Sequence, residues 1–307
     1  QLTGLAVEKI VMVDSSETQL FEIHASLQTD IEMIPELSDV QDMVQMKVIF
    51  ERHKPEIVFH AAAYKHVGLL ERQPSAAVRN NIIGTHRLAC VASKYDVGRF
   101  VLISTDKAVE PSSVMGATKR VSERLMEGHA LQTDKTRFIS VRFGNVLGSS
   151  GSVVPIFHKQ IEEGGPVTVR DPEATRFFMS IPEAAGLVLA SAAIGSNSDR
   201  FILDMGEPVK IKDLAEQMIH LSGKTAGKDI DIKFTGMMPG EKLHEELHSP
   251  DENLTKTEHP KVFRIESDEL SEAQWVELSS EIEAAENMND ADSLRWLQRV
   301  LPNFKPE

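Results

Sequence analysis

The sequence predicts an α/β protein with a doubly wound, mostly parallel sheet and a smaller α+β lobe toward its C-terminal end. Two observations support this fold class. Through the first half of the chain, apolar β-prone segments alternate with segments of helical pattern, which is the order that builds parallel sheets. Polar residues then follow directly on several predicted strands, at the edge where open α/β sheets place their ligands.

The predicted strands of the first half are short apolar runs bounded by polar residues. They cover residues 9–13, 32–35, 56–61, 99–103 and 137–143. Helical patterns lie between them, at residues 42–52, 75–95 and 114–131. Each strand is thus followed by a helix or a loop before the next strand, as a parallel sheet requires.

The pattern becomes irregular after the turn cluster Gly164-Gly165-Pro166. We expect a helix over 182–193, a short strand over 200–204, a helix over 211–221 and an acidic helical tail over 268–301. The predicted organisation is a sheet domain over residues 1–165 and a second lobe over 166–307, with residues 182–204 packing back on the first domain.

The start of the chain departs from what a dinucleotide-binding fold needs. Such folds open with a strand, a glycine-rich turn and a helix, because glycines let the backbone approach a pyrophosphate. Before Lys9 there is only Gly4, and Gln1-Leu2-Thr3 looks like the end of a helix. We therefore expect the sequence to lack the first strand and phosphate loop through truncation, with a natural protein without them as the alternative.

Composition excludes several classes of protein. A net charge of -14 argues against a nucleic-acid partner, although a nucleotide ligand needs only a few local cations and helix N-termini. The single Cys90 excludes an internal disulfide and suits a reducing compartment. No apolar run approaches the ~18 residues of a membrane span, and no signal peptide is visible. The histidines, including His60, His66 and His86, show no metal-ligand spacing with carboxylates or Cys90, so we expect no metal site.

A cluster of reactive side chains follows the strand over residues 99–103. It consists of Ser104-Thr105-Asp106-Lys107, followed by a helix on which Met115 and Lys119 share one face. A hydroxyl, an acid and two amines gathered at a strand tip resemble a catalytic site. The structural alternatives are an Asp106–Lys107 ion pair that only closes the strand end, and a Met115 that only packs in the core.

The spacing of these residues resembles the extended short-chain dehydrogenase/reductase superfamily, with Met115 at the position of its catalytic tyrosine. One branch shares that methionine: the bacterial nucleotide-sugar 4,6-dehydratases of the polysaccharide biosynthesis family. The resemblance runs nearly end to end, through segments at 60–67, 81–85, 105–107, 141–148, 175–179 and 239–243. Each segment alone is a weak signal, but their order and spacing together are highly specific.

The resemblance implies a Rossmann-like NAD-binding domain over residues 1–165 and a substrate-binding lobe beyond it. The implied enzyme is a UDP-N-acetylglucosamine 4,6-dehydratase, which makes a UDP-4-keto-6-deoxy sugar for surface polysaccharide. Asp106 is assigned as the acid that assists loss of the C6 hydroxyl, and Lys107 as the base at C5, with burial and Lys119 promoting its neutral form. Because Met115 cannot exchange a proton, Thr105 or Asp106 must take the C4 hydroxyl proton.

For the cofactor, NAD is expected, with NADP as the alternative. Asp14 ends the strand over 9–13, where it either contacts the adenosine ribose or caps the next helix; an acid there would repel a 2′-phosphate. The resemblance extends the predicted cofactor site to a larger set: Ser15, Ser16, Asp39, Val40, Ala61, Ala62, Ala63, Lys65, Asn81, Lys119 and Val146.

The resemblance also assigns a substrate site on the other side of the catalytic cluster. Its predicted members are Lys65, Ser104, Thr105, Asn145, Ser150, Gly151, Ser152, Val153, Val154, Pro155, Val167, Val169, Arg176, Met238 and Glu241. Residues 149–155 are expected to wrap the nucleotide as a loop, with an ordinary loop as the alternative. Met238 stands where the family usually has an arginine that meets the diphosphate, so one expected charge is absent.

Two rival functions follow from the same departures. The missing tyrosine, glycine loop and arginine favour a nucleotide-sugar-binding protein without turnover, whereas Asp106, Lys107 and Lys119 favour an enzyme. A nucleotide-sugar 4-epimerase is the third reading, but its chemistry relies on the tyrosine. We expect a cytoplasmic protein, placed on the inner membrane face only if an N-terminal membrane domain is missing, and a homo-oligomer without nucleic acid.

Overall fold

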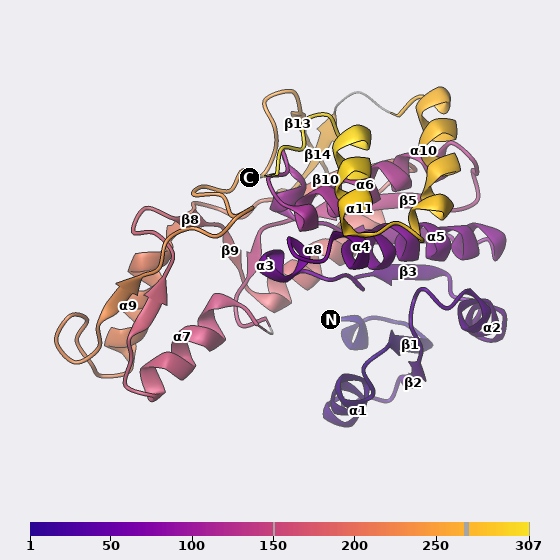
Figure 1. The fold of residues 1–307 in the computed structure, drawn as a ribbon. Coiled ribbons are helices and arrows are strands. Elements are labelled where there is room, and N and C mark those ends of the chain that lie inside the picture. The colour runs from indigo at the N-terminus through magenta and orange to yellow at the C-terminus, as the bar shows by residue number, and fades with distance from the viewer. Residues whose placement is uncertain (150, 267–269, 307) are drawn as a thin grey trace.

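A six-stranded sheet in the order β13-β14-β10-β5-β4-β3 forms the centre of the fold. The computed structural model describes residues 1–149, 151–266 and 270–306. β3 (Ile57–His60), β4 (Arg99–Ile103), β5 (Arg137–Arg142) and β10 (Arg200–Leu203) run parallel, and β14 (Val262–Glu266) and β13 (Asn253–Lys256) extend the sheet antiparallel (Figure 1). The predicted α/β fold with a mostly parallel sheet is confirmed.

Helices cover both faces of this sheet, so alternate residues of β4 enter two different cores. Phe100 and Leu102 belong to the cluster formed with α5 (Gly84–Lys94) and α6 (Val114–Ala130). Val101 belongs to the cluster formed with α8 (Ile181–Ile194) on the opposite face. Burial on both sides explains why this strand is apolar throughout instead of alternating with polar residues.

The first two strands stand apart from the main sheet. β1 (Lys9–Asp14) and β2 (Glu32–Leu37) form a parallel pair, and within the described residues they pair with each other and not with β3 (Figure 1). The alternation of strands and helices in the sequence did not indicate this separation. α1 (Glu17–Ser26) lies beside β1 and β2, and α2 (Met43–His53) ties them to the core through Met46, Ile49 and Phe50.

The helical segment predicted over 75–95 consists of three continuous parts. α4 (Pro74–Ala77) leads into a π-helical segment η2 (Val78–Ile83) and then into α5. π-helical turns often accompany functional positions, because the wider turn changes the direction in which side chains project. Asn81, a predicted site residue, lies inside this segment.

A small lobe lies at one end of the molecule (Figure 1). It contains α7 (Val153–Glu162), β7 (Val167–Val169), α9 (Ile211–Leu221) and β12 (Ile232–Phe234), packed around Phe157, Ile161 and Ile219. β7 and β12 pair in parallel. Thus α7, which precedes the predicted boundary at residue 165, packs with the elements that follow it.

The C-terminal helices return to the first part of the chain. α10 (Glu272–Ala285) and α11 (Asp290–Val300) pack against α4, η2 and α6, and Arg87 on α5 pairs with both Glu283 and Glu286. Together with β10, β13 and β14, these helices place much of the predicted second lobe on the main sheet. The packing of α8 and β10 on the first domain agrees with the expectation for residues 182–204, whereas the domain boundary itself stays a prediction.

The remaining elements are short. They are η1 (Leu2–Gly4), α3 (Val67–Leu70), η3 (Asp106–Ala108), β6 (Asn145–Val146), β8 (Thr175–Arg176), β9 (Phe178–Met179) and β11 (Val209–Lys210). Among the described residues, no helix has both the length and the apolar character that crossing a bilayer demands.

Candidate functional site

The reactive cluster is held at the carboxyl end of β4 by close backbone packing. The chain turns from β4 into η3, where Thr105 accepts a hydrogen bond from the Lys107 amide, and then into α6, capped by Ser113. A side chain on Gly116 would place its Cβ 2.1 Å from the carbonyl oxygen of Lys107. The absence of a side chain there lets the start of α6 lie directly against the turn that carries Asp106 and Lys107.

Asp106 and Lys107 form an ion pair at this point. The Lys107 Nζ lies 2.9 Å from Asp106 Oδ1, and the Thr105 hydroxyl donates to the same oxygen at 2.9 Å. The Asp106 side chain is fully buried, whereas that of Lys107 is 23% exposed. Among the described residues, Asp106 Oδ2 has no hydrogen-bond donor. An unpartnered carboxylate oxygen beside a partly open amine can act on a bound ligand.

Further residues complete what we call the Asp106 cluster: Asp106, Lys107, Asn145, Glu245 and Arg176. Lys107 donates to Asn145 Oδ1 at 3.3 Å and lies 3.4 Å from Glu245 Oε1. Arg176 Nε lies 3.6 Å from the same Glu245 oxygen, and Glu245 Oε2 lacks a hydrogen-bond partner within the described chain. Two buried carboxylates and two cations therefore share one site.

The expectation that Lys107 is held neutral is wrong for the protein without ligand. Burial alone would lower the pKa of Lys107, but the carboxylates of Asp106 and Glu245 outweigh burial and raise that pKa above its ordinary value. Lys119 shows the opposite balance, since burial lowers its pKa to about 8 despite the opposing charge of Glu123. Lys119 has neither a hydrogen bond nor an ion pair within the described residues, and His60 beside it has a pKa lowered to about 3 by burial and by the lysine charge.

Ser104 and Met115 have structural contacts that the sequence did not indicate. The Ser104 hydroxyl is buried and donates to Glu123 Oε1 at 2.6 Å, and its assignment to substrate binding stays a prediction. Met115 is 4% exposed and belongs to the core around α5 and α6. The packing alternative for Met115 is thus observed, and its role as a wall of the site stays a prediction.

Glu123 belongs to a second group of buried charges, which we call the Arg142 cluster: Arg142, Glu123 and Glu252, with Arg120 and Arg200 at its edge. Arg142 contacts Glu123 at 2.8 Å and Glu252 at 2.7 Å, and all three of its guanidinium nitrogens are bonded. Burial would raise the pKa of Glu123, but Arg142 and Arg120 hold that pKa well below its usual range. Every carboxylate oxygen of Glu123 and Glu252 has a partner, as a structural network requires.

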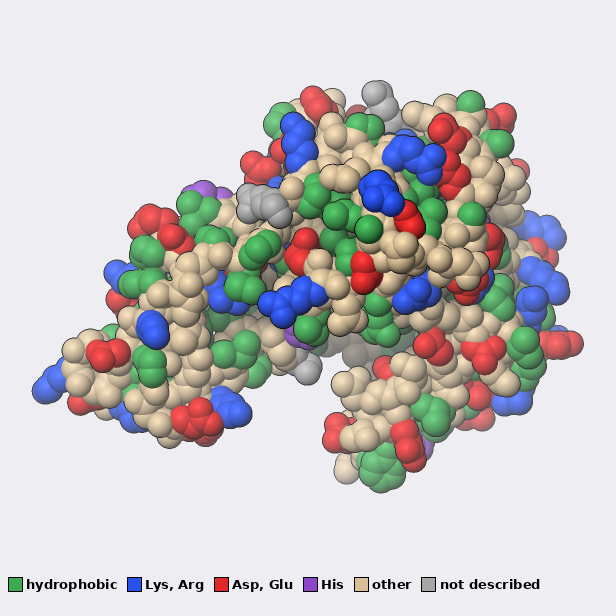
Figure 2. Space-filling view, viewed as in Figure 1, with side chains coloured by type: hydrophobic (Ala, Val, Ile, Leu, Met, Phe, Trp, Pro, Cys, Tyr) green, Lys and Arg blue, Asp and Glu red, His purple; other side chains and the backbone are tan. Residues whose placement is uncertain are grey.

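The predicted cofactor side of the site is open. Ala61 and Ala62 follow β3 and are exposed, as is Lys65, while Ala63 is half-buried. Asn81 binds the backbone of Tyr64 in both directions, accepting from its amide at 2.8 Å and donating to its carbonyl at 2.9 Å. Asn81 therefore fixes the course of the chain through this turn, and its predicted part in the cofactor site stays a prediction. Figure 2 shows a broad hollow between the lobe that carries α7 and the part that carries β1 and β2.

At the end of β1, Asp14 closes a local turn and Ser16, not Asp14, caps the next helix. Asp14 Oδ1 accepts from the Ser16 amide at 2.7 Å, and Ser16 caps α1 by accepting from Gln19. Asp39 forms a similar turn with the Gln41 amide at 2.8 Å, and Asp42 caps the helix that follows. The cofactor contacts predicted for Asp14, Ser15, Asp39 and Val40 stay predictions.

A pocket of about 290 Å³ adjoins the Asp106 cluster on the side of the small lobe. Five of the predicted substrate residues line it: Asn145, Val153, Val169, Arg176 and Glu241. Because Asn145 also contacts Lys107, the pocket and the ion pair form one continuous site. Arg170, Thr168 and Thr235 line it as well, and sequence reasoning missed these three residues.

Other predicted substrate residues lie beside this pocket instead of lining it. Val167 is fully buried beneath it in β7, and Val154 and Pro155 belong to the first turn of α7, so the expected loop over 149–155 ends at Ser152. Gly151 lies against the ring of His66, where a Cβ would approach within 2.8 Å. Ser150 lies outside the described residues. Met238 donates its backbone amide to Glu241 Oε2 at 3.1 Å.

Val146, a predicted cofactor residue, lies in β6 next to Asn145 and pairs with Met179. Glu245 is the main residue that sequence reasoning missed. It lies in an irregular segment 138 positions beyond Lys107 in numbering, with no periodicity to place it. The contacts of Lys107 and Arg176 with one carboxylate could be found only from the three-dimensional arrangement.

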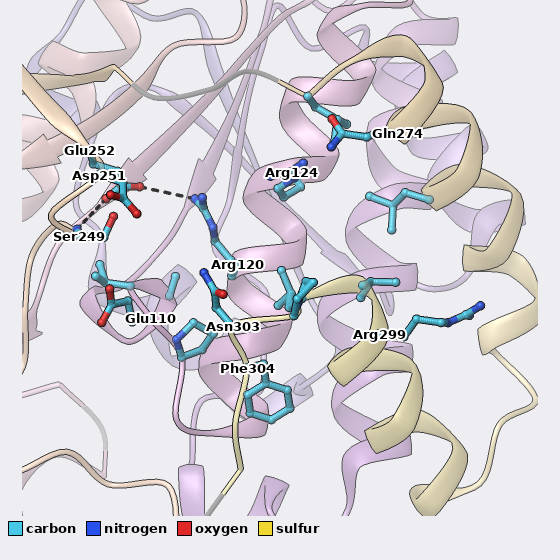
Figure 3. A pocket seen from close by; sticks show the side chains of 18 of the residues that line it. Glu110, Arg120, Arg124, Ser249, Asp251, Glu252, Gln274, Arg299, Asn303 and Phe304 are labelled. Atoms are coloured by element: carbon cyan, nitrogen blue, oxygen red, sulfur yellow. Dashed lines mark hydrogen bonds and ion pairs between the residues drawn. The ribbon is translucent and has the colours of Figure 1, made fainter.

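A second pocket, of about 520 Å³, lies between α6 and the C-terminal segment. Arg120 and Arg124 project from α6 into it, and Asn303 and Phe304 line its other side (Figure 3). None of the predicted site residues is among those that line it. Its position and lining therefore separate it from the Asp106 cluster.

Comparison with known proteins agrees with this geometry. The capsular polysaccharide biosynthesis protein CapD of Staphylococcus aureus is 48% identical over 268 residues, which cover 86% of this chain and 45% of CapD. The probable polysaccharide biosynthesis protein EpsC of Bacillus subtilis is 44% identical over 296 residues, covering 95% of this chain and 49% of EpsC. The chain spans about half the length of these curated relatives.

Solved structures show the same fold. Pen from Bacillus thuringiensis has a TM-score of 0.78 at 32% identity, covering 85% of this chain and 81% of Pen. A dTDP-glucose 4,6-dehydratase from Bacillus anthracis, solved with NAD, has a TM-score of 0.68 at 17% identity over 81% of each chain, a likeness of fold alone. The sequence profile of the polysaccharide biosynthesis protein family matches residues 1–267. The chain therefore belongs to the polysaccharide biosynthesis protein family and has the Rossmann-like fold of short-chain dehydrogenase/reductases.

Proposed function

We propose that this chain carries the catalytic site of a nucleotide-sugar 4,6-dehydratase that acts on UDP-N-acetylglucosamine with NAD. The observation that carries the proposal is the buried Asp106–Lys107 pair, which Asn145 joins to the 290 Å³ pocket. Family membership supports a nucleotide-sugar-modifying enzyme. The resemblance of the methionine-containing site to the 4,6-dehydratases supports the finer assignment.

Different residues would hold the two ligands. Lys119 and the exposed Ala61–Ala62 edge suit the cofactor, because a buried amine without a partner among the described residues can donate to ribose hydroxyls and small side chains permit close approach. Arg176, Arg170 and Glu241 in the pocket suit a uridine diphosphate. When bound, NAD accepts a hydride from C4 of the sugar and returns it at C6.

The proton steps can be assigned to this chain's own side chains. In the ion pair, Asp106 is a carboxylate and Lys107 is an ammonium. A carboxylic acid at Asp106 with a neutral amine at Lys107, which we call the neutral pair, contains the same number of protons. When a substrate covers Lys107 and excludes water, the lower dielectric favours the neutral pair. That neutral pair is what elimination needs: an amine that removes the C5 proton and an acid that protonates the departing C6 hydroxyl.

The C4 hydroxyl proton needs a different acceptor, because Met115 stands where relatives in the superfamily use a tyrosine. The hydrogen bond from Thr105 Oγ1 to Asp106 Oδ1 forms the second half of a relay. A C4 hydroxyl that donates to Thr105 would pass its proton to the Asp106 carboxylate through that bond, while the Lys107 ammonium would release its own proton to solvent as the substrate covers it. The pair then holds the acid at Asp106 and the neutral amine at Lys107 that elimination needs. Thr105 therefore has a direct part in the proposed first step.

The test is conversion of UDP-N-acetylglucosamine to its 4-keto-6-deoxy product by full-length protein supplied with NAD. We expect Asp106→Asn and Lys107→Ala each to reduce turnover by about 10²–10⁴-fold, the usual contribution of a positioned acid or base. The exposed pair Asp96–Lys135, at 2.8 Å, provides matched controls, and Asp96→Asn and Lys135→Ala should leave turnover unchanged.

The outcomes separate the rival functions. Unchanged product formation in both Asp106→Asn and Lys107→Ala would remove the acid–base assignment. Tight UDP-sugar binding by wild-type protein without any 4-keto product would favour a binding protein without turnover. Formation of the 4-epimer instead of a 4-keto sugar would favour an epimerase.

A further inference from the structure

Three metal-ligating side chains meet where α5 lies against the C-terminal end of α6. His86 and Cys90 lie four residues apart on α5 and so share one face, and His129 faces them from α6. One ligand atom from each lies within 4.8 Å of the others. The sequence analysis missed this group because its third member lies 43 residues beyond His86.

The separations match those of a metal site. Cys90 Sγ lies 3.7 Å from His86 Nε2, and His129 Nε2 lies 3.1 Å from His86 Nδ1. Around a tetrahedral Zn²⁺, bond lengths of about 2.3 Å to sulfur and about 2.0–2.1 Å to nitrogen place sulfur roughly 3.5 Å and nitrogen roughly 3.4 Å from a neighbouring nitrogen. Only small side-chain movements are therefore needed.

One of these movements is a turn of the His86 ring. The two contacts of His86 use opposite nitrogens of its ring, so metal binding requires the ring to turn until one nitrogen faces both partners. That turn gives up the hydrogen bond to His129, and coordination to a transition metal more than replaces it. The exposed edge of Cys90 provides the route of entry and room for a water ligand.

An aromatic ring, that of Trp275, and a carboxylate, that of Glu283, lie near these three side chains. Trp275 packs at 5.1 Å from the His129 ring and 6.1 Å from the His86 ring, between centroids. The carboxylate of Glu283, held by Arg87 at 2.7 Å, is close enough to influence the charge state of both His86 and Cys90. His129 is buried and His86 half-buried, and the Cys90 thiol must release its proton when a metal binds.

We propose that His86, Cys90 and His129 form a binding site for a divalent transition metal ion of the Zn²⁺ class, with water as the fourth ligand. Two nitrogens and one sulfur are the donor set that such ions prefer over Mg²⁺ or Ca²⁺. His129 lies ten residues beyond Lys119 on α6, about 15 Å along the helix. The ion would therefore join α5 to α6 structurally and take no part in the sugar chemistry.

The test uses chelator-treated protein titrated with Co²⁺, whose absorption reports both tetrahedral geometry and a bond to thiolate. We expect one Co²⁺ per chain and a thiolate charge-transfer band in the wild type. Cys90→Ser should abolish that band, and both Cys90→Ser and His86→Gln should weaken Zn²⁺ binding by more than the ~10–100-fold that outer-shell partners contribute. Zn²⁺ should also raise the Tm of the wild type and not of these variants.

His158→Gln is the matched control, because His158 is an exposed helical histidine beside a carboxylate, 3.4 Å from Glu162. It should bind Co²⁺ as the wild type does. The absence of a charge-transfer band in wild-type protein, or equal Zn²⁺ affinity in wild type, Cys90→Ser and His86→Gln, would overturn the proposal. The three residues would then be only a packed, hydrogen-bonded group. Circular dichroism of each variant separates loss of binding from loss of folding.

Discussion

The Arg142 cluster and the Asp106 cluster are both buried groups of charges, but they differ in how completely their atoms are bonded. In the first, every guanidinium nitrogen of Arg142 and every carboxylate oxygen of Glu123 and Glu252 has a partner. In the second, Asp106 and Glu245 each keep one buried oxygen without a hydrogen bond from any described residue. Complete bonding is what a structural network needs, whereas unpartnered atoms indicate a place for a ligand. The comparison teaches that burial of charge alone does not identify a functional site.

The largest effect should come from breaking the Arg142 cluster. Arg142→Met leaves Glu123 and Glu252 buried without their main counter-charge, so the free energy of unfolding should fall by about 3–5 kcal/mol. Urea denaturation followed by circular dichroism measures this. Arg52→Met removes an exposed pair with Glu36 and should change stability by no more than about 1 kcal/mol. If both variants lose equally little, the structural role given to the Arg142 cluster is wrong.

The next effect tests how the Asp106 cluster is positioned. Gly116→Ala forces α6 away from the Lys107 carbonyl, and overpacking of this kind costs about 1–3 kcal/mol of stability. Turnover should fall with it, because Asp106 and Lys107 move relative to Lys119. Gly186→Ala in α8 meets nothing within 4 Å and should stabilise the protein slightly through helix propensity. An equal Tm for Gly116→Ala and Gly186→Ala would show that the protein accommodates a Cβ at position 116 without loss of stability.

Ser104 lies two residues before Asp106 in the chain, but its hydroxyl bonds to Glu123 of the Arg142 cluster. Ser104→Ala removes a hydrogen bond to the charged Glu123, so stability should fall by roughly 1.5–3 kcal/mol while the KM for nucleotide sugar stays unchanged. Steady-state kinetics and thermal denaturation measure the two quantities on the same preparation. A raised KM with unchanged Tm would instead restore the substrate contact that the sequence predicted.

The smallest expected effect concerns pH. Glu245 helps to raise the pKa of Lys107, so Glu245→Gln should lower that pKa. If the neutral amine is the base, the rising limb of kcat/KM against pH should then move to lower pH, with little change in Tm. The exposed neighbour Glu246 provides the control, and Glu246→Gln should leave the profile in place. A limb that moves to higher pH would contradict the role given to Lys107.

Local patterns predicted the elements of the fold well. The strand over 99–103 and the helix over 211–221 have the predicted bounds, because apolar runs and helical periodicity are properties of adjacent residues. The separation of the β1–β2 pair from the main sheet, and the return of α10 and α11 to α4 and α6, depend on contacts between distant segments. No periodicity in residues 268–301 indicates against which surface those helices pack.

The candidate site also has parts that neighbouring residues predict and parts that depend on contacts between distant segments. Asp106, Lys107 and Lys119 were identified because they lie close together in sequence around one strand tip, and Asn145 and Glu241 came from the family resemblance. The charge state of Lys107 was predicted wrongly because Glu245 reaches it from a distant irregular segment. The hydrogen bond of Ser104 to Glu123 was likewise not predicted, because Glu123 lies on a helix that the sequence placed but could not orient.

Asn145 has a consequence for how the two ends of the site communicate. Its amide oxygen accepts from Lys107, and its side chain also lines the pocket proposed for the nucleotide. A ligand that recruits this amide takes one acceptor away from the ammonium group. Binding of the substrate would thereby lower the pKa of Lys107. Substrate recognition and the proton transfer proposed for Lys107 would then both depend on the Asn145 carboxamide.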